Sequence, residues 1–269
     1  MSAQRIRDIF LFVLFAFVLC VYCNISSTNK IKITTTTSLL SSIIEAIGKQ
    51  RIDVTTIVPA GMCPGHFDIK AGDLKDLANS RVLLNHGWEK WINKLLDAVD
   101  NKPVLFTINV EGNLMVPQIH KKASKHIVAL LCSLDQAHQE YYSDNFASYM
   151  TIIDSLEKLI RKKVEKLNGI KVVCSELQVE FIEWIGFDVV RTYERAEDLT
   201  PKVLSEIIRE AKKENIKLVI DNLQSGSDIG LNIAQETGAK HIILTNFPLK
   251  GSYPNALIYN TNTILQALQ

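Results

Sequence analysis

The chain has 269 residues, 47% of them hydrophobic and 22% charged, and its formal net charge is +1. A nearly neutral chain without a basic stretch interleaved with aromatic residues gives no reason to expect nucleic acid as a partner. The length accommodates two modest domains or one large one, and the composition is that of an ordinary globular protein.

The N-terminus departs from this ordinary composition. Arg5 and Arg7 precede an unbroken apolar run from Ile9 to Cys23. Such a run is short for a transmembrane helix and typical of the core of a signal peptide. We therefore predict that residues 1–23 are a signal peptide or an N-terminal membrane anchor. This segment would place the rest of the chain outside the cytoplasm, in the periplasm or on the cell surface, and tether it to the membrane.

Cys20 and Cys23 end the apolar run, where a lipid-bearing cysteine would stand. The bulky residues before them, Leu19 and Tyr22, make a poor processing site. Cleavage, lipidation and retention as an uncleaved anchor therefore all stay open.

Residues 24–30 (NISSTNK) are polar and are predicted to link this segment to the folded part. From residue 31 the chain alternates short β-branched runs with helical patterns, which favours parallel βαβ units. The predicted strands are 31–35, 53–58, 81–84 and 104–107, and the predicted helices are 39–47, 72–78, 89–96 and 117–134. We expect residues 31–142 to form an N-terminal α/β lobe.

A long helix is predicted next, over residues 143–169. Between Asp144 and Asn168 there is no Pro or Gly, and apolar residues recur at the three-and-four spacing of one helical face. Ser143 or Asp144 is the predicted N-cap, and Gly169 ends the helix. At 1.5 Å per residue it would be roughly 35 to 40 Å long, enough to connect two lobes.

The alternation of strands and helices then resumes. The predicted strands are 171–174, 187–191, 218–220 and 242–245, and the predicted helices are 178–185, 201–213, 228–236 and 255–268. Thr200 as a cap and Pro201 at the first helical position mark one helix start. The predicted fold class is therefore α/β: two lobes with mostly parallel sheets flanked by helices, residues 170–269 forming the second, joined by one long connecting helix.

In α/β sheets, ligands bind beyond the carboxyl ends of the strands. The polar residues that follow the predicted strands are Cys63, His66, Asp68, Asn85, His86, Ser175, Glu176, Tyr193, Glu194, Asp221, Asn222, Gln224, Thr245 and Asn246. A histidine and several carboxylates that converge from such strand ends could bind a divalent cation. His86 is expected instead to end its strand and pack on Trp88. His120, His126 and His138 have lysine neighbours on helical patterns and are expected on solvated faces.

One stretch carries a more specific pattern. Residues 57–97 contain GHFDIKAGD, LANSRVLLNHG and WEKWINKLL in succession. They resemble the metal-binding part of the ABC-transporter solute-binding proteins that collect zinc or manganese. The segment YYSDNFASYMTIIDSLEKL looks like the long helix that connects the lobes in that family, and NTNTILQAL looks like its closing helix. The resemblance covers most of residues 31–269 and implies the same two-lobed fold.

The resemblance also implies metal ligands. The first ligand of the family, a histidine in a Pro-rich loop, falls on His66, and the third falls on Glu176 if one gap is allowed. The second, a histidine before the helix that starts at Pro117, has no counterpart among residues 111–114, Glu-Gly-Asn-Leu. The fourth, an aspartate, falls close to the uncharged Asn246.

Two further residues are candidates on their own chemistry. Cys63 stands three residues before His66 and could add a thiolate, which would favour zinc. Asp221, with Asn222, is expected to line the cleft at the end of its strand. The predicted metal site therefore consists of His66, Glu176, Cys63, Asn246 and Asp221.

Four functional hypotheses follow. The first is a non-enzymatic solute-binding protein that captures zinc or manganese as cargo between the lobes and delivers it to an ABC permease. In the second, the same fold binds a metal chelate or a corrinoid-like ligand, because two of the four inherited positions lack a typical ligand. A hydrolase that uses Cys63 and His66 is a third, although no oxyanion site or third catalytic member is evident. The fourth is a non-catalytic adhesion or structural role.

Overall fold

The structure is a computed structural model, and it describes residues 30–269, except for the side chain of His66. The predicted signal or anchor segment, with Cys20 and Cys23, lies outside the described residues. Within residues 30–269, no helix is both long and apolar enough to cross a membrane.

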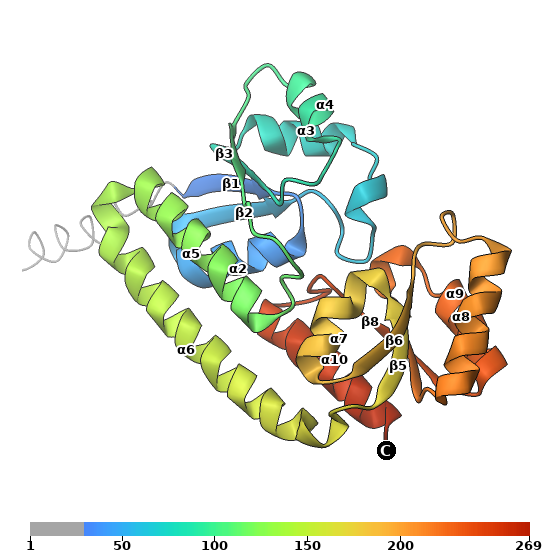
Figure 1. Cartoon of the computed structure of the whole chain (residues 1–269). Helices are drawn as coiled ribbons and strands as arrows, with labels where there is room; N and C mark the ends of the chain where they lie inside the picture. The colour runs from blue at the N-terminus through green and yellow to red at the C-terminus, as the bar shows by residue number, and fades with distance from the viewer. Residues whose placement is uncertain (1–29) are drawn as a thin grey trace, which may run out of the picture.

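The N-terminal lobe contains a four-stranded parallel sheet in the order β2-β1-β3-β4. Its strands are β1 (Ile31–Thr35), β2 (Ile52–Thr56), β3 (Val82–Asn85) and β4 (Val104–Thr107), and its helices are α2 (Ser38–Gly48), α3 (Ala71–Ala78) and α4 (Ile92–Asp97). The central strand β3 is buried along its whole length, as expected for a strand covered on both faces. Figure 1 shows α3 and α4 on one side of this sheet and α2 on the other.

The C-terminal lobe repeats this arrangement, with the sheet order β6-β5-β7-β8, again all parallel. Its strands are β5 (Lys171–Ser175), β6 (Asp188–Tyr193), β7 (Leu218–Asn222) and β8 (Lys240–Leu244), and its helices are α7 (Val179–Ile185), α8 (Pro201–Glu214), α9 (Asp228–Thr237) and α10 (Tyr253–Ala267). The predicted cap of α8 is confirmed, because the Thr200 hydroxyl accepts a hydrogen bond from the amide of Val203. The predicted α/β class with two parallel sheets is confirmed.

Two long antiparallel helices join the lobes. Helix α5 (Pro117–Leu134) leads to α6 (Gln139–Val164), which runs along one side of the molecule from the N-terminal lobe to the C-terminal lobe (Figure 1). Helix α6 begins at Gln139, so the predicted cap at Ser143 or Asp144 is wrong. A 3-10 turn over Gln136–His138 leads the chain directly into the helix, and Asp144 lies on its exposed face.

The lobes share one continuous apolar core. Buried residues of α2, α5, α6, α7 and α10 belong to a single cluster that reaches both sheets. His120 of α5 lies inside it, stacked on Tyr253 at 3.5 Å between ring centroids and hydrogen-bonded to the hydroxyl of Tyr149 at 2.7 Å. The prediction of a solvated His120 is therefore wrong: desolvation lowers its pKa to about 3, and the imidazole is neutral at physiological pH.

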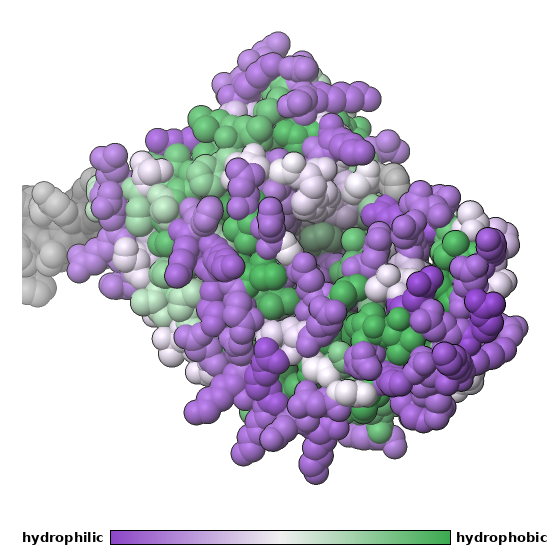
Figure 2. Space-filling model, in the orientation of Figure 1, coloured by the Kyte–Doolittle hydropathy of each residue, from purple (hydrophilic) through white to green (hydrophobic). Residues whose placement is uncertain are grey.

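Away from this core, hydrophilic side chains cover most of the face in Figure 2, including the outward side of α6, and a recess separates the two lobes. The exposed His126 on α5 agrees with its predicted solvated position.

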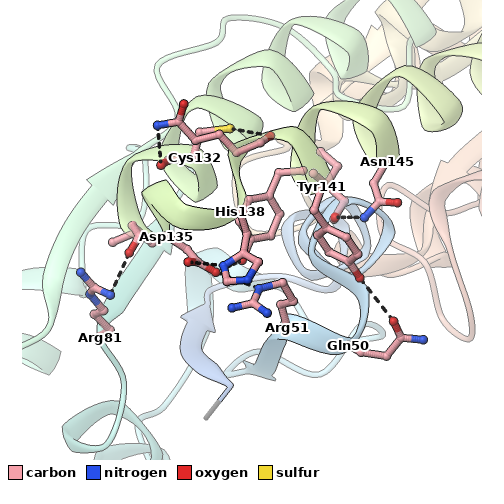
Figure 3. A network of polar contacts seen from close by, with 12 residues as sticks. Gln50, Arg51, Arg81, Cys132, Asp135, His138, Tyr141 and Asn145 are labelled. Carbon is pink, nitrogen blue, oxygen red and sulfur yellow. Dashed lines mark hydrogen bonds and ion pairs between the residues drawn. The ribbon is translucent and has the colours of Figure 1, made fainter. Parts of the chain in front are cut away.

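A polar network fastens the corner between α5 and α6 to the N-terminal lobe (Figure 3). Asp135 accepts hydrogen bonds from Arg51 Nε at 2.8 Å and from the Tyr142 hydroxyl at 2.9 Å, and its other oxygen lies 2.8 Å from His138 Nδ1. Desolvation raises the pKa of Asp135, but these three hydrogen bonds and the charge of Arg51 outweigh it and lower the pKa to about 2. Asn145 adds a hydrogen bond to the carbonyl of Ile47 at 2.9 Å.

Candidate functional site

A cavity of about 410 Å³ lies between the lobes, at the carboxyl ends of both parallel sheets. This is the position at which α/β sheets place their ligands. The residues that line it from both lobes are Leu39, Cys63, Pro64, Gly65, His86, Trp88, Gly112, Asn113, Leu114, Glu176, Leu177, Glu180, Arg195, Asn222, Gln224, Asn246 and Phe247.

The loop that carries Cys63 and His66 follows β2 and forms one 3-10 turn over Pro64–His66. The backbone of this loop is held by a hydrogen bond, which the indole nitrogen of Trp91 donates to the carbonyl of Pro64 at 2.6 Å. Phe67 is buried directly after the turn, 5.5 Å from the ring of Trp91. These contacts hold the loop at the cavity wall, which Cys63 lines as a half-buried free cysteine.

Arg195, after β6, approaches the same loop from the C-terminal lobe. A side chain built on Gly65 would begin 3.8 and 3.9 Å from the two terminal guanidinium nitrogens of Arg195 and 3.5 Å from the sulfur of Cys63. A permanent positive charge therefore lies beside the loop that carries the first predicted ligand.

Amide side chains from both lobes form a cluster at the cavity. Asn246 Oδ1 accepts hydrogen bonds from Asn113 Nδ2 and from Gln178 Nε2, both at 3.1 Å. Asn246 Nδ2 donates to the carbonyl of Leu177 at 2.9 Å, and Asn113 Nδ2 donates to the same carbonyl at 3.0 Å. Gln178 also donates to Asn222 Oδ1 at 3.0 Å. These residues, Asn113, Gln178, Asn222 and Asn246, form what we name the amide cluster.

The amide cluster connects the lobes. Asn113 belongs to the loop before α5, in the region where the resemblance places a histidine ligand, and it hydrogen-bonds Asn246, which stands near the inherited aspartate position. The Glu180 carboxylate of α7 also accepts a hydrogen bond from the backbone amide of Asn113. Gln224 adds a further cross-lobe contact by donating to the carbonyl of Ala60 at 2.7 Å.

His86 lies in the cavity wall with its ring stacked on Trp88 at 5.2 Å, which confirms the predicted packing. Its Nε2 lies 2.9 Å from the Thr37 hydroxyl. Desolvation lowers the pKa of His86 to about 4, although the charge of Glu89 opposes this shift, so the ring is neutral at physiological pH. The His86 imidazole therefore contributes an uncharged polar group to the cavity lining.

The buried Glu89 has a role that our sequence analysis did not identify. It accepts hydrogen bonds from the Thr36 hydroxyl at 2.6 Å, the His86 amide at 3.1 Å and the Gly87 amide at 2.9 Å. It thereby ties the turn after β3 to the turn after β1. In the sequence, Glu89 stands three residues after His86 and two after the turn glycine Gly87. This spacing could have indicated that its carboxylate accepts hydrogen bonds from the backbone of the turn.

Asp221 lies apart from the large cavity. Its carboxylate is buried, accepts from the Tyr193 hydroxyl at 2.6 Å and lies 2.6 Å from His241 Nε2. It lines a small adjoining pocket of about 50 Å³ with Tyr193, Glu194 and Asp228. Helix α9 closes over it at Gly230, where a side chain would begin only 2.2 Å from the carboxylate oxygen.

The structure thus brings Cys63, Glu176 and Asn246 to one cavity, on the wall of which the His66 backbone turn also lies. Among the side chains of the described residues, which do not include that of His66, no group of three or more His, Cys, Asp or Glu could hold a metal ion.

Known proteins share this architecture and sequence pattern. The chain is 23% identical over 265 residues to the manganese-binding lipoprotein MntA of Halalkalibacterium halodurans, with 88% of each chain covered. It is 24% identical over 221 residues to the iron ABC transporter substrate-binding lipoprotein MtsA of Streptococcus pyogenes, with 70% of each covered.

Solved structures show the same fold. The crystal structure of ZnuA superposes with a TM-score of 0.77 at 19% identity, covering 90% of this chain and 100% of that one. A Mn-bound periplasmic metal binding protein from Candidatus Liberibacter asiaticus gives a TM-score of 0.77 at 19% identity, covering 89% and 100%.

The family model of the periplasmic zinc-uptake complex component A matches residues 33–267, which is nearly the whole described structure. The resemblance in the Pro-rich loop and the long connecting helix is thereby confirmed. The chain belongs to the ZnuA family of metal-type solute-binding proteins.

Proposed function

We propose that the protein is an extracytoplasmic solute-binding protein that captures a divalent metal, zinc or manganese, in the cleft between the lobes and passes it to an ABC permease. Membership of the ZnuA family and the cavity at the strand ends support this proposal. The relatives named above carry different metals, manganese in one and iron in another, so the family alone leaves the metal open.

In this proposal, His66 is the principal ligand, and Cys63 and Glu176 complete the coordination from the two sides of the cavity. Asn246 would contribute an amide oxygen only by giving up a hydrogen bond of the amide cluster. To bind the metal, the Asp221 carboxylate would have to give up its hydrogen bonds with both Tyr193 and His241. A histidine, a thiolate and a carboxylate suit zinc better than manganese.

The N-terminal segment completes the proposal. Residues 1–23 would direct export or anchor the protein, residues 24–30 would act as a linker, and the two lobes at 31–142 and 170–269 would present the cleft to the permease. Transport relatives of this kind are binding proteins rather than enzymes, and we propose the same for this chain.

The test is metal analysis of the full chain, purified in detergent without a metal-affinity tag. The wild-type protein should carry close to one equivalent of zinc or manganese, and His66→Ala should lose it. His126→Ala, a change of an exposed histidine on α5, is the matched control and should keep the metal. Full occupancy in the His66→Ala protein would contradict the site.

A metal chelate or corrinoid-like ligand is the second candidate. The exposed indole of Trp88 in the cavity lining favours it, because a planar organic group can stack on an indole. The cavity of about 410 Å³ accommodates a small chelate rather than a corrinoid, which is a much larger molecule.

A further inference from the structure

The loop before α5 carries Asn113 into the cleft and is shaped by short-range hydrogen bonds. Asn113 Oδ1 accepts from the amide of Met115 at 2.8 Å, and the Asn113 carbonyl accepts from the amide of Val116 at 2.9 Å. Gly112 has a φ of +96°, and a side chain there would begin 2.7 Å from a carboxylate oxygen of Glu180. The loop is therefore tightly confined, and the direction of the Asn113 side chain depends on where Met115 is held.

Met115 is held a second time, from helix α10. The hydroxyl of Tyr253 donates to the Met115 carbonyl at 3.0 Å, and both residues are completely buried. A carbonyl at such a position has no water to replace a lost donor, so it would stay unpaired without the Tyr253 hydroxyl. Through its amide and its carbonyl, Met115 thus connects the closing helix of the chain to the cleft loop.

Two further residues fix the ring of Tyr253. The imidazole of His120 stacks on it at 3.5 Å between centroids, and His120 Nε2 lies 2.7 Å from the hydroxyl of Tyr149. The three side chains come from three different helices, α10, α5 and α6, and all three are buried. Because a packed ring between rigid helices has little freedom to move, the Tyr253 hydroxyl is held at one place.

The position of Asn113 matters for the contact between the lobes. Its Nδ2 donates across the cleft to Asn246 Oδ1 at 3.1 Å and to the Leu177 carbonyl at 3.0 Å. A displacement of the Asn113 side chain by about 1 Å would take both contacts beyond hydrogen-bonding distance. The cross-lobe part of the amide cluster therefore depends on the placement of the loop before α5.

From these contacts we infer that Tyr253 is a positioning residue of the cleft. Held in place by His120, it fixes the loop of Asn113 so that Asn113 joins the two lobes, although Tyr253 itself does not line the cavity. The proposed ligands come from both lobes, so a cleft that is held closed binds the metal more tightly. This effect on the cargo rests on the proposed function, whereas the placement of the loop does not.

Hydrogen–deuterium exchange of the full chain in detergent, followed by mass spectrometry, tests the positioning role without any metal. The backbone amides of Asn113, Met115 and Val116 are all hydrogen-bonded, so their exchange measures how often the loop opens. Tyr253→Phe keeps the stacked ring and removes only the hydroxyl. It should accelerate exchange of these three amides roughly 3- to 10-fold, the effect of one lost hydrogen bond. Unchanged exchange at these amides would overturn the inference.

Tyr142→Phe is the matched control, because it also removes the hydroxyl of a completely buried tyrosine. That hydroxyl donates to Asp135 at 2.9 Å, at the corner between α5 and α6. The control should leave exchange in the loop before α5 as it is in the wild type. Equal acceleration of this loop in both variants would indicate a general loss of stability and would also overturn the inference.

Zinc binding tests the consequence for the cargo. Titration calorimetry of the full chain with zinc chloride should give a dissociation constant roughly 2- to 5-fold larger for Tyr253→Phe than for the wild type or Tyr142→Phe, because less of the protein is closed. Equal dissociation constants in all three proteins would overturn the effect on the cargo. A wild type that binds no zinc would overturn the proposed function, and the exchange measurement would still decide the role of Tyr253.

Discussion

Asn246 uses its uncharged amide group to join the two lobes by hydrogen bonds. Its oxygen accepts from an amide of each lobe, Asn113 and Gln178, and its nitrogen donates to the Leu177 carbonyl. An aspartate could accept the same two hydrogen bonds but would face the Leu177 carbonyl without a hydrogen to donate. The asparagine therefore closes the cleft with hydrogen bonds that need no metal ion.

The Asn246→Ala protein should be less stable by about 1 to 3 kcal/mol, because Asn113 and Gln178 lose their shared acceptor in a part-buried site. Chemical denaturation followed by circular dichroism measures the difference. Asn232→Ala on the exposed side of α9 is the control and should leave the free energy of unfolding nearly unchanged. An Asn246→Ala protein with wild-type stability would show that the amide cluster does not hold the lobes together.

Sequence reasoning reached some of these residues and missed others for a physical reason. Cys63 and Glu176 lie in loops that follow predicted strands, and parallel topology brings such loops to one edge of a sheet. Asn246 was also a predicted site residue, but its partner Asn113 was not, because the two are 133 residues apart and no periodicity marks a pair of amides that meet between lobes. His120 has lysine neighbours that predict a solvated face, but stacking on Tyr253 and burial against α6 override that local pattern.

At the scale of the elements, the corner between α5 and α6 depends on Asp135. Its carboxylate joins Arg51, which precedes β2, to Tyr142 on α6 and His138 in the turn between the helices. The helix periodicity predicted both helices but not this turn, so the start of α6 was misplaced by about one helical turn. Asp135 contacts a residue 84 positions away in the sequence, and no pattern along the chain indicates such a contact.

Asp135 should make stability depend on acid pH. Its pKa is lowered from an ordinary 3.8 to about 2, so its contribution is complete above pH 4 and disappears as the pH falls towards 2. Asp135→Asn should cost about 2 kcal/mol at pH 7, and the difference from wild type should shrink between pH 4 and pH 2. Thermal unfolding across this pH range measures both effects.

Asp154→Asn is the matched control for this prediction. Asp154 pairs with Lys121 at 2.8 Å, but its side chain is 63% exposed, so the pair contributes little. The control should unfold like the wild type throughout. A wild-type pH profile in the Asp135→Asn protein would contradict the role of Asp135.

At the scale of the whole molecule, the lobes are coupled strongly. Helix α6 extends from one to the other, one apolar core continues between the sheets, and Gln224 and Asn113 bond across the cleft. The alternation of strands and helices predicted the two sheets and the connecting helix. The cross-lobe contacts could not be predicted, because they depend on the packing of complete lobes.

This coupling predicts a small movement on loading rather than a wide hinge closure. Small-angle X-ray scattering of the metal-free and loaded protein should give the same radius of gyration within error. A clear compaction on loading would show that the lobes rotate and that the cross-lobe hydrogen bonds open in the empty protein.

Anomalous X-ray diffraction from crystals of the zinc-loaded protein tests most directly whether a metal is captured beside the Cys63–His66 loop. We expect one strong anomalous peak in the cavity between the lobes, within coordination distance of His66, and no such peak in crystals of His66→Ala. A peak elsewhere on the molecule, or no peak in the cleft of the zinc-loaded wild type, would contradict this expectation.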